Sequence, residues 1–139
     1  MMTVLVIYET TRGRTRAMAE AICKGVESEN KPCNLVEAKN FRSLGEPCAI
    51  AMGSSTRMKR ILPKLRQILA DLPGLTGIAA AAYGSYGWSG EAPDTIAEEL
   101  SKLGAVLVEY QPIKAKYYPS GNILDKCREL GVILARKCE

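Results

Sequence analysis

Residues 79–91, AAAAYGSYGWSGE, join a run of alanines to a glycine-rich loop that contains the chain's single tryptophan, Trp88. A strand made of alanine fits the centre of a sheet whose helices pack closely against both faces. In the loop, glycines alternate with Ser85, Tyr86, Trp88 and Ser89. Glycine lets the backbone approach a ligand closely, and the aromatic rings add a flat surface beside it. The segment therefore predicts a central strand followed by a loop that holds a flat, polar ligand.

Apolar runs alternate with helical periodicities along the rest of the chain. Continuous or weaker apolar runs, which are typical of strands, lie at 4–7, 33–38, 48–52, 78–82 and 106–108. The last of these is expected to run on irregularly toward Tyr118. Apolar residues at helical spacing predict helices over 14–28, 58–72, 92–103 and 122–137. Pro63 is expected in the first turn of the second helix, and Gly104 and Ser120 are expected as caps of the third and fourth.

This alternation predicts an α/β fold, a three-layer α/β/α sandwich in which right-handed crossovers place helices on both faces of a parallel sheet. Five strands in a chain of 139 residues favour the doubly wound strand order 2-1-3-4-5. The length is that of one domain, so we expect residues 1–139 to fold as a single unit.

The composition limits the possible chemistry. The chain has no histidine, which removes Ser-His and Cys-His catalysis and most transition-metal sites. The cysteines include no CxxC pair, so we interpret them as small core residues of a cytoplasmic protein. No apolar run is long enough to cross a membrane, and the net charge of +4 comes without a nucleic-acid-binding motif. Redox or group-transfer chemistry is therefore expected to come from a cofactor.

Three polar loops are expected to meet at one edge of the sheet. They follow the first, third and fourth strands and read TTRGRT at 10–15, GSSTRMKR at 53–60 and YGSYGWSGE at 83–91. Ligands of open parallel sheets bind beyond the carboxyl ends of the strands, where the strand order reverses. For the order 2-1-3-4-5 this point lies between the first and third strands. The loops therefore predict a ligand site there.

The first loop has the features of a phosphate site. Its threonines supply hydroxyls, its glycine lets the turn close, its arginines add positive charge, and the following helix directs free N–H groups toward it. Simple capping of that helix by Thr10 or Thr11 is the alternative. The loop is neither a Walker A sequence nor GxGxxG. The candidate residues are Thr10, Thr11, Arg12, Gly13, Arg14 and Thr15.

The second and third loops have the features of a site for a polar chain and a flat ring. The second loop offers hydroxyl and backbone groups, and the third offers Tyr86 and Trp88 for stacking, although both rings could simply pack in the core or at its rim. Tyr117 and Tyr118 are expected to pack at the edge. One phosphate, a polar middle and a flat ring fit FMN. The candidate residues are Ser54, Ser55, Thr56, Arg57, Gly84, Ser85, Tyr86, Gly87, Trp88, Ser89 and Gly90.

The segment GSYGWSGEA at 84–92 resembles the flavodoxin domain at the C-terminal end of flavodiiron (A-type) flavoproteins. GSST at 53–56, ILPKLRQILADL at 61–72 and KYYPS at 116–120 support the resemblance, which covers nearly the whole chain. It implies a flavodoxin-like fold, FMN as the cofactor and electron transfer as the function. The flavodoxin phosphate pattern S/T-x-T-G-x-T maps onto residues 10–15. Arg12 stands where a hydroxyl is usual, Arg14 where Asn is common, and Ser55 where Pro is common.

Flavodiiron proteins also have an iron-binding domain whose ligands are largely histidine and carboxylate, and no such domain is expected here. The resemblance therefore implies that electrons pass to a separate redox protein. Two groups of cations, Arg12, Arg14 and Arg16, then Arg57, Lys59 and Arg60, follow strands directly. They favour an acidic partner, such as a ferredoxin-like or rubredoxin-like protein or a separate metalloprotein chain. No nucleic-acid or membrane partner is expected.

We therefore expect an FMN-binding carrier that shuttles electrons between redox proteins, with the flavin ring between the second and third loops and its dimethylbenzene edge toward solvent. No side chain has to act as an acid or base, so we predict no catalytic residue and no metal ligand. Two alternatives stay open. The first is an FMN-dependent reductase that takes hydride from NAD(P)H, with Arg57, Lys59 and Arg60 on the nicotinamide phosphate. The second is a flavin-free binding domain that has kept the fold.

Overall fold

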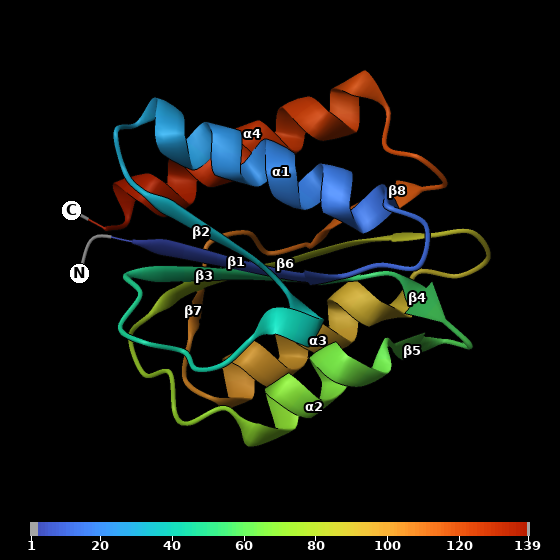
Figure 1. Cartoon of the computed structure of the whole chain (residues 1–139), viewed down its shortest axis with the longest axis horizontal. Coiled ribbons are helices and arrows are strands. Elements are labelled where there is room, and N and C mark those ends of the chain that lie inside the picture. The colour runs from blue at the N-terminus through green and yellow to red at the C-terminus, as the bar shows by residue number, and fades with distance from the viewer. Residues whose placement is uncertain (1–2, 139) are drawn as a thin grey trace.

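The computed structural model describes residues 3–138 and has three layers, a sheet between two pairs of helices (Figure 1). The helices α1 (Arg14–Ser28) and α4 (Gly121–Arg136) cover one face, and α2 (Pro63–Asp71) and α3 (Glu91–Lys102) cover the other (Figure 1). The strands of the sheet are β1 (Val4–Glu9), β2 (Cys33–Glu37), β3 (Ala49–Ser54), β6 (Ala79–Tyr86), β7 (Val106–Leu107) and β8 (Ile113–Lys116). A short 3-10 helix, η1 (Ala38–Asn40), follows β2, and the hairpin β4 (Thr56–Arg57) and β5 (Arg60–Ile61) follows β3.

The strand order β2-β1-β3-β6-β7, with every pair of this sheet parallel, confirms the predicted order 2-1-3-4-5. The fourth predicted strand is β6. The fifth is divided, because β7 pairs with residues 79 and 80 of β6 while β8 pairs with residues 83–86. This division confirms the expected irregular continuation of the last strand.

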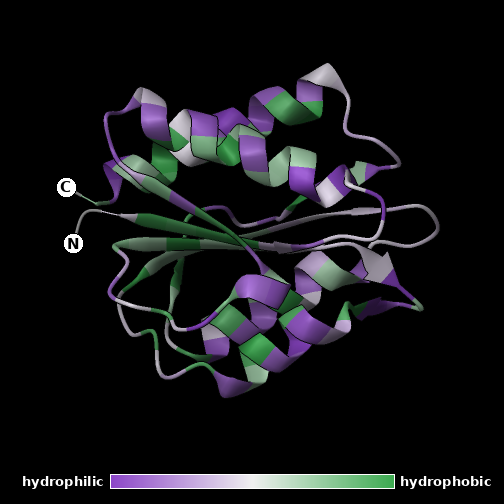
Figure 2. Ribbon diagram, in the orientation of Figure 1, coloured by the Kyte–Doolittle hydropathy of each residue, from purple (hydrophilic) through white to green (hydrophobic). Residues whose placement is uncertain are grey.

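The alanines of β6 allow helices to pack closely on both faces of the sheet. Ala79 and Ala81 belong to the buried cluster under α1 and α4, and Ala80 and Ala82 to the cluster under α2 and α3. Figure 2 shows the same division as hydrophobic strands between helices whose outer surfaces are hydrophilic. A small side chain at the centre leaves the larger residues of the helices to fill the two interiors. The alanine run is therefore central, as predicted.

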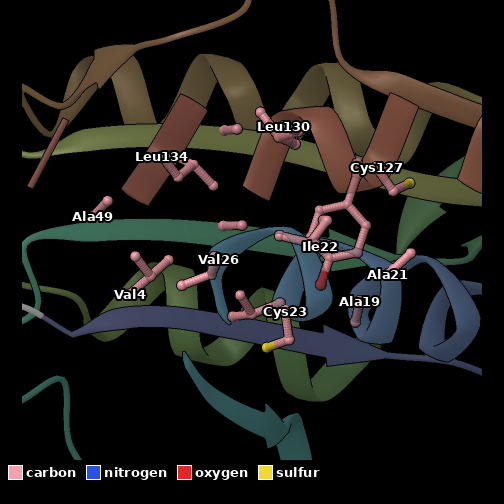
Figure 3. Packing of buried hydrophobic residues seen from close by; sticks show 14 of the residues in the cluster. Val4, Ala19, Ala21, Ile22, Cys23, Val26, Ala49, Cys127, Leu130 and Leu134 are labelled. Carbon is pink, nitrogen blue, oxygen red and sulfur yellow. The ribbon is translucent and has the colours of Figure 1, made fainter. Parts of the chain in front are cut away.

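The helices α1 and α4 touch at two glycines. A Cβ atom added to Gly25 would overlap the carbonyl of Arg128, and one added to Gly131 would overlap the carbonyl of Ile22. Around this contact, Ile22 and Val26 of α1 and Leu130 and Leu134 of α4 belong to one buried cluster (Figure 3). The absence of side chains at the crossing lets the two backbones approach, and this distance sets how α1 lies on the sheet.

The prediction of a helix over 58–72 is wrong at its start, because residues 56–61 form the β4–β5 hairpin. Met58 and Lys59 form its tip, with positive φ values of 52° and 62°. The residue before a proline is disfavoured in the helical region, and Leu62 is accordingly extended, with φ −61° and ψ 150°. The helix can begin only at Pro63. The strand β6 is also longer than predicted, so Gly84, Ser85 and Tyr86 lie on the strand and not in the loop.

The interpretation of the cysteines as unpaired core residues is wrong for four of the five, which form the disulfides Cys23–Cys33 and Cys48–Cys138. The first joins α1 to the start of β2, and the second joins the end of α4 to the residue before β3. Sequence spacing does not reveal such pairs, since the second spans 90 residues. Cys127 is free and buried, and burial raises the pKa of its thiol to about 12.

None of the helices within residues 3–138 is long and apolar enough to span a lipid bilayer.

Replacing Gly131 by Ala is expected to lower the free energy of unfolding by roughly 1–3 kcal/mol, because the new methyl group must push α1 and α4 apart. Denaturant unfolding measures this change. Gly121→Ala is the matched control in the same helix, since nothing lies near its Cβ position and its backbone is not left-handed. Equal stability of the two variants would contradict the close contact.

Candidate functional site

The loops that follow β1, β3 and β6 lie together at one edge of the sheet, at the right of the view in Figure 1. This edge contains the carboxyl ends of the parallel strands. The strand order reverses there, because β1 lies between β2 and β3. The structure therefore brings the three predicted loops to the predicted position.

A buried cluster of three hydroxyls connects these loops. Thr15 Oγ1 lies 2.8 Å from Ser85 Oγ and 3.2 Å from Ser55 Oγ, and the two serine oxygens lie 3.5 Å apart. Thr15 and Ser85 are almost completely inaccessible, with exposed fractions of 0% and 1%. Thr15 is in the first turn of α1, Ser55 follows β3 and Ser85 is near the end of β6, so the hydrogen bonds hold together the three segments from which the loops extend.

The first turn of α1 is open to an acceptor from outside the chain. Its N-cap is Gly13, with φ 79°, a left-handed conformation that suits glycine, and no side chain caps it. The Oγ1 of Thr10 accepts from the N–H of Gly13, 3.0 Å away, and so shapes the turn before the helix. By contrast, side chains accept from first-turn N–H groups of the other helices: Glu9 in α2, Thr56 in α3 and Ser120 in α4. The bond to Ser120 confirms the predicted cap of α4.

The second loop is held by two side chains that were predicted as ligand residues. Ser54 Oγ donates to the carbonyl of Ser55 and accepts from the N–H of Leu62, at 2.7 and 3.0 Å. Thr56 Oγ1 accepts from the N–H of Ala92, 3.0 Å away. These bonds fasten the base of the β4–β5 hairpin to β3 and α3. Arg57, in β4, is exposed.

A hollow of about 420 Å³ lies between the hairpin tip and the third loop, and it is lined by Thr56, Met58, Lys59, Trp88 and Ser89. Met58 and Trp88 are 87% and 91% exposed. Two exposed apolar side chains on either side of one hollow offer apolar surface to a ligand. Met58 was not among the predicted ligand residues, because helical spacing placed it on the apolar face of a helix. Pro63 was the signal that could have placed it in a loop.

Two of the glycines in the third predicted segment pack closely within the protein, and Gly84 leaves no room for a side chain. A Cβ at Gly84 would overlap the carbonyl of Ser54 on the neighbouring strand, and one at Gly90 would lie 3.0 Å from the ring of Tyr86. Tyr86 is half-buried and packs on Gly90. Gly87 and Trp88 are exposed, and they form the tip of the loop.

The third loop ends with an unpaired buried acceptor. Oε1 of Glu91, at the start of α3, is inaccessible and has no hydrogen-bond partner within the described chain. Most buried acceptors in proteins are hydrogen-bonded, so this atom is an exception among the described residues. Those residues also contain no group of three or more acidic or cysteine side chains placed to hold a metal ion.

The model of the flavodoxin family matches residues 6–131. The chain belongs to the flavodoxin family. This membership confirms the predicted fold, and FMN, the cofactor of flavodoxins, is the cofactor that was predicted. The three-loop edge described above is therefore the region to test for FMN.

Similar proteins include flavodoxins and longer enzymes. The chain is 33% identical over 147 aligned residues to the anaerobic nitric oxide reductase flavorubredoxin of Vibrio vulnificus. The alignment covers 96% of this chain and 28% of the flavorubredoxin. A flavodoxin from the domain Archaea is 35% identical, with a TM-score of 0.89 and 98% of each chain covered. The rubredoxin oxygen:oxidoreductase of Desulfovibrio gigas is 25% identical, with a TM-score of 0.92, covering 99% of this chain and 36% of that one. The flavodiiron relationship predicted from GSYGWSGEA is confirmed. The chain spans little more than a quarter of the flavorubredoxin.

Replacing Thr15 by Val is expected to destabilise the protein by roughly 1–3 kcal/mol, because the buried hydroxyls of Ser55 and Ser85 lose a partner at nearly constant side-chain volume. Denaturant unfolding measures the loss. Thr11→Val, at an exposed position of the same loop, is the control and should change stability little. A stable Thr15 variant would mean that the hydroxyl cluster does not hold the loops.

Proposed function

We propose that residues 1–139 act as one flavodoxin unit that binds FMN and carries electrons between redox proteins. The observation that carries this proposal is the hollow beside Trp88 and Met58, at the edge where the three loops are joined by buried hydroxyls. When bound there, FMN supplies the ability to accept and release electrons one at a time. No side chain needs to act as a catalytic acid or base.

The donors of the site fit the parts of FMN. The open first turn of α1 and residues 10–15 suit the phosphate, because a helix N-terminus offers free N–H groups and favourable electrostatics to an anion. Trp88 and Met58 flank a hollow that suits a flat aromatic ring. In this proposal Thr15, Ser55 and Ser85 act by holding the loops in place.

The surface around the hollow fits an acidic partner. The hairpin presents Arg57, Lys59 and Arg60, all exposed, and none of them takes part in an ion pair of residues 3–138. A second hollow of about 500 Å³ beside α2 adds Arg66 to this positive surface. We propose that an acidic redox protein, of the ferredoxin or rubredoxin kind, docks here.

A cytoplasmic location is part of the proposal. It requires two disulfides that persist under reducing conditions, as those of intracellular hyperthermophile proteins do.

Quenching of FMN fluorescence on titration with the protein tests the cofactor, and Trp88→Ala tests the ring site. The variant is expected to bind FMN roughly tenfold more weakly, because one stacked aromatic contact is lost. Tyr110→Ala, a change at an aromatic residue that is 88% exposed outside the hollow, should leave the affinity unchanged. A protein that does not quench FMN would refute the proposal. Rapid bleaching of bound flavin by NADPH without a partner would instead favour the reductase.

Electron exchange with an acidic redox protein is expected to slow as ionic strength rises, because screening weakens the attraction that brings the partners together. The double variant Lys59→Gln/Arg60→Gln should flatten this dependence in stopped-flow measurements. Lys24→Gln/Lys137→Gln removes the same charge from exposed positions outside the hairpin and is the control. An equal effect of both double variants would place the docking surface elsewhere.

A further inference from the structure

The second hollow, beside α2, lies where the hairpin meets α2 and α3 (Figure 1). It has an apolar floor, because Ile61 of β5 and Leu69 of α2 line it and are only 6% and 7% exposed. Ala70 of α2 also lines it, is exposed, and offers a methyl group where a larger side chain would fill the space. The volume of about 500 Å³ is within the range of about 300–1,000 Å³ that is typical of binding pockets.

The rim of this hollow carries positive charge that no acidic side chain balances. Lys59, Arg60 and Arg66 line it, all three are exposed, and none of them takes part in an ion pair of residues 3–138. Glu99 is the acidic residue among those that line the hollow, and Nζ of Lys102 lies 3.7 Å from its Oε1. Because Lys102 offsets the charge of Glu99, the three unpaired cations determine the sign of the potential, and the hollow attracts carboxylates.

The polar groups of the second hollow lie at its rim and not inside it. None of the polar side chains that line it is buried, whereas the buried hydroxyls of Thr15, Ser55 and Ser85 lie in the cluster that joins the three segments. A pocket for a small molecule usually contains a few polar groups that converge and fix the orientation of the ligand. A side chain of a docked protein needs no such groups, because the rest of the interface holds it. The second hollow therefore fits an inserted protein side chain.

The second hollow adjoins the one in which the flavin ring is proposed to lie. Lys59, at the tip of the hairpin, lines both hollows. A protein seated in the second hollow would therefore cover the hairpin and come next to the exposed side chains of Met58 and Trp88. Electron transfer requires the redox centre of the partner to lie close to the flavin, and this position meets that requirement.

We propose that the second hollow anchors the acidic redox protein: a large apolar side chain of the partner enters it against Leu69 and Ala70, and a neighbouring carboxylate of the partner binds Arg66. The cations of the hairpin speed the approach, whereas the inserted side chain and its carboxylate stabilise the complex once it has formed. The docking segment of the partner therefore carries an aliphatic or aromatic residue next to Asp or Glu. This inference rests on the proposed function, in which the chain passes electrons to an acidic protein.

The test follows the reduction of an acidic rubredoxin by the FMN-loaded, chemically reduced protein in stopped-flow measurements, in which one electron passes from the reduced flavin to the ferric iron. The measured quantity is the rubredoxin concentration that gives half the limiting rate. Ala70→Trp fills the hollow without changing the charge, and Arg66→Gln removes one rim charge, and each is expected to raise this concentration roughly tenfold. Ser101→Trp adds the same ring at an exposed position of α3 outside this hollow, and Lys64→Gln removes the same charge from an exposed position of α2 outside it. Each control should change the concentration less than twofold.

Equal effects of Arg66→Gln and Lys64→Gln would overturn the anchor in favour of general electrostatics, and an unchanged concentration in Ala70→Trp would mean that no side chain enters the hollow. Quenching of FMN fluorescence checks that each variant has folded. Should Ala70→Trp fail this check, Thr95→Trp fills the hollow from α3 and carries the same expectation.

The same measurements separate this inference from the proposed function. An unmodified protein that binds no FMN, or that binds it and reduces no acidic rubredoxin, overturns the proposed function and the anchor with it. A protein that binds FMN and reduces rubredoxin with the same half-saturating concentration in every variant overturns only the anchor.

Discussion

The hydrogen bonds of the Thr15 hydroxyl are the interaction on which the site depends. They reach Ser55 and Ser85, which are 40 and 70 residues away in the sequence, within a buried cluster. Inside a protein, a hydroxyl without a partner is costly, so three hydroxyls that satisfy one another favour a single arrangement of their loops. The hollow beside Trp88 lies between the second and third loops, which extend from segments that the cluster joins. The reversal of strand order brings all three loops within reach of Thr15.

Alanines in the sheet and glycines in two of the helices determine where Thr15 lies. The alanines of β6 let both helix layers approach the sheet, and Gly25 and Gly131 let α1 and α4 approach each other. Close packing of α1 on β1 and α4 fixes the direction of its axis, and hence the direction of its first-turn N–H groups. Packing deep in the molecule therefore sets the orientation of the donors at the edge.

Several exposed cations at this edge have no ion-pair partner. Elsewhere some cations are paired, as Arg16 is with Glu20 and Arg136 with Glu29, while others such as Lys24 and Lys137 are in no ion pair of residues 3–138. The cations around the hollow, on the hairpin and beside Tyr117, have no such partners within residues 3–138. Exposed ion pairs add little stability, so the pairing pattern matters less for folding than for what the surface attracts. An anionic ligand near α1 and an acidic protein near the hairpin would each approach positive charge that no acidic side chain neutralises.

Much of the fold could be predicted from the sequence, because it depends on local patterns. Helical periodicity placed α1 at 14–28, as observed, and apolar runs placed the central strands. The failure at 58–62 is instructive. An apolar stripe continued through this segment, but the restriction before Pro63 keeps Leu62 out of the helix, and the residues before it form a hairpin that exposes Met58. The restriction before proline, applied more strictly, would have excluded residues 58–62 from the helix.

The sequence by itself determined the layers, the family and the edge at which a ligand is expected, and it favoured the strand order that the structure shows. Tertiary structure alone decided that Thr15, Ser55 and Ser85 share one cluster, that Cys48 pairs with Cys138, and that Arg14 rests on a neighbouring ring. The physical reason is distance along the chain. Periodicity and turn preferences act between residues a few positions apart, whereas these contacts join residues 40 to 103 positions apart, which come together only when the layers pack.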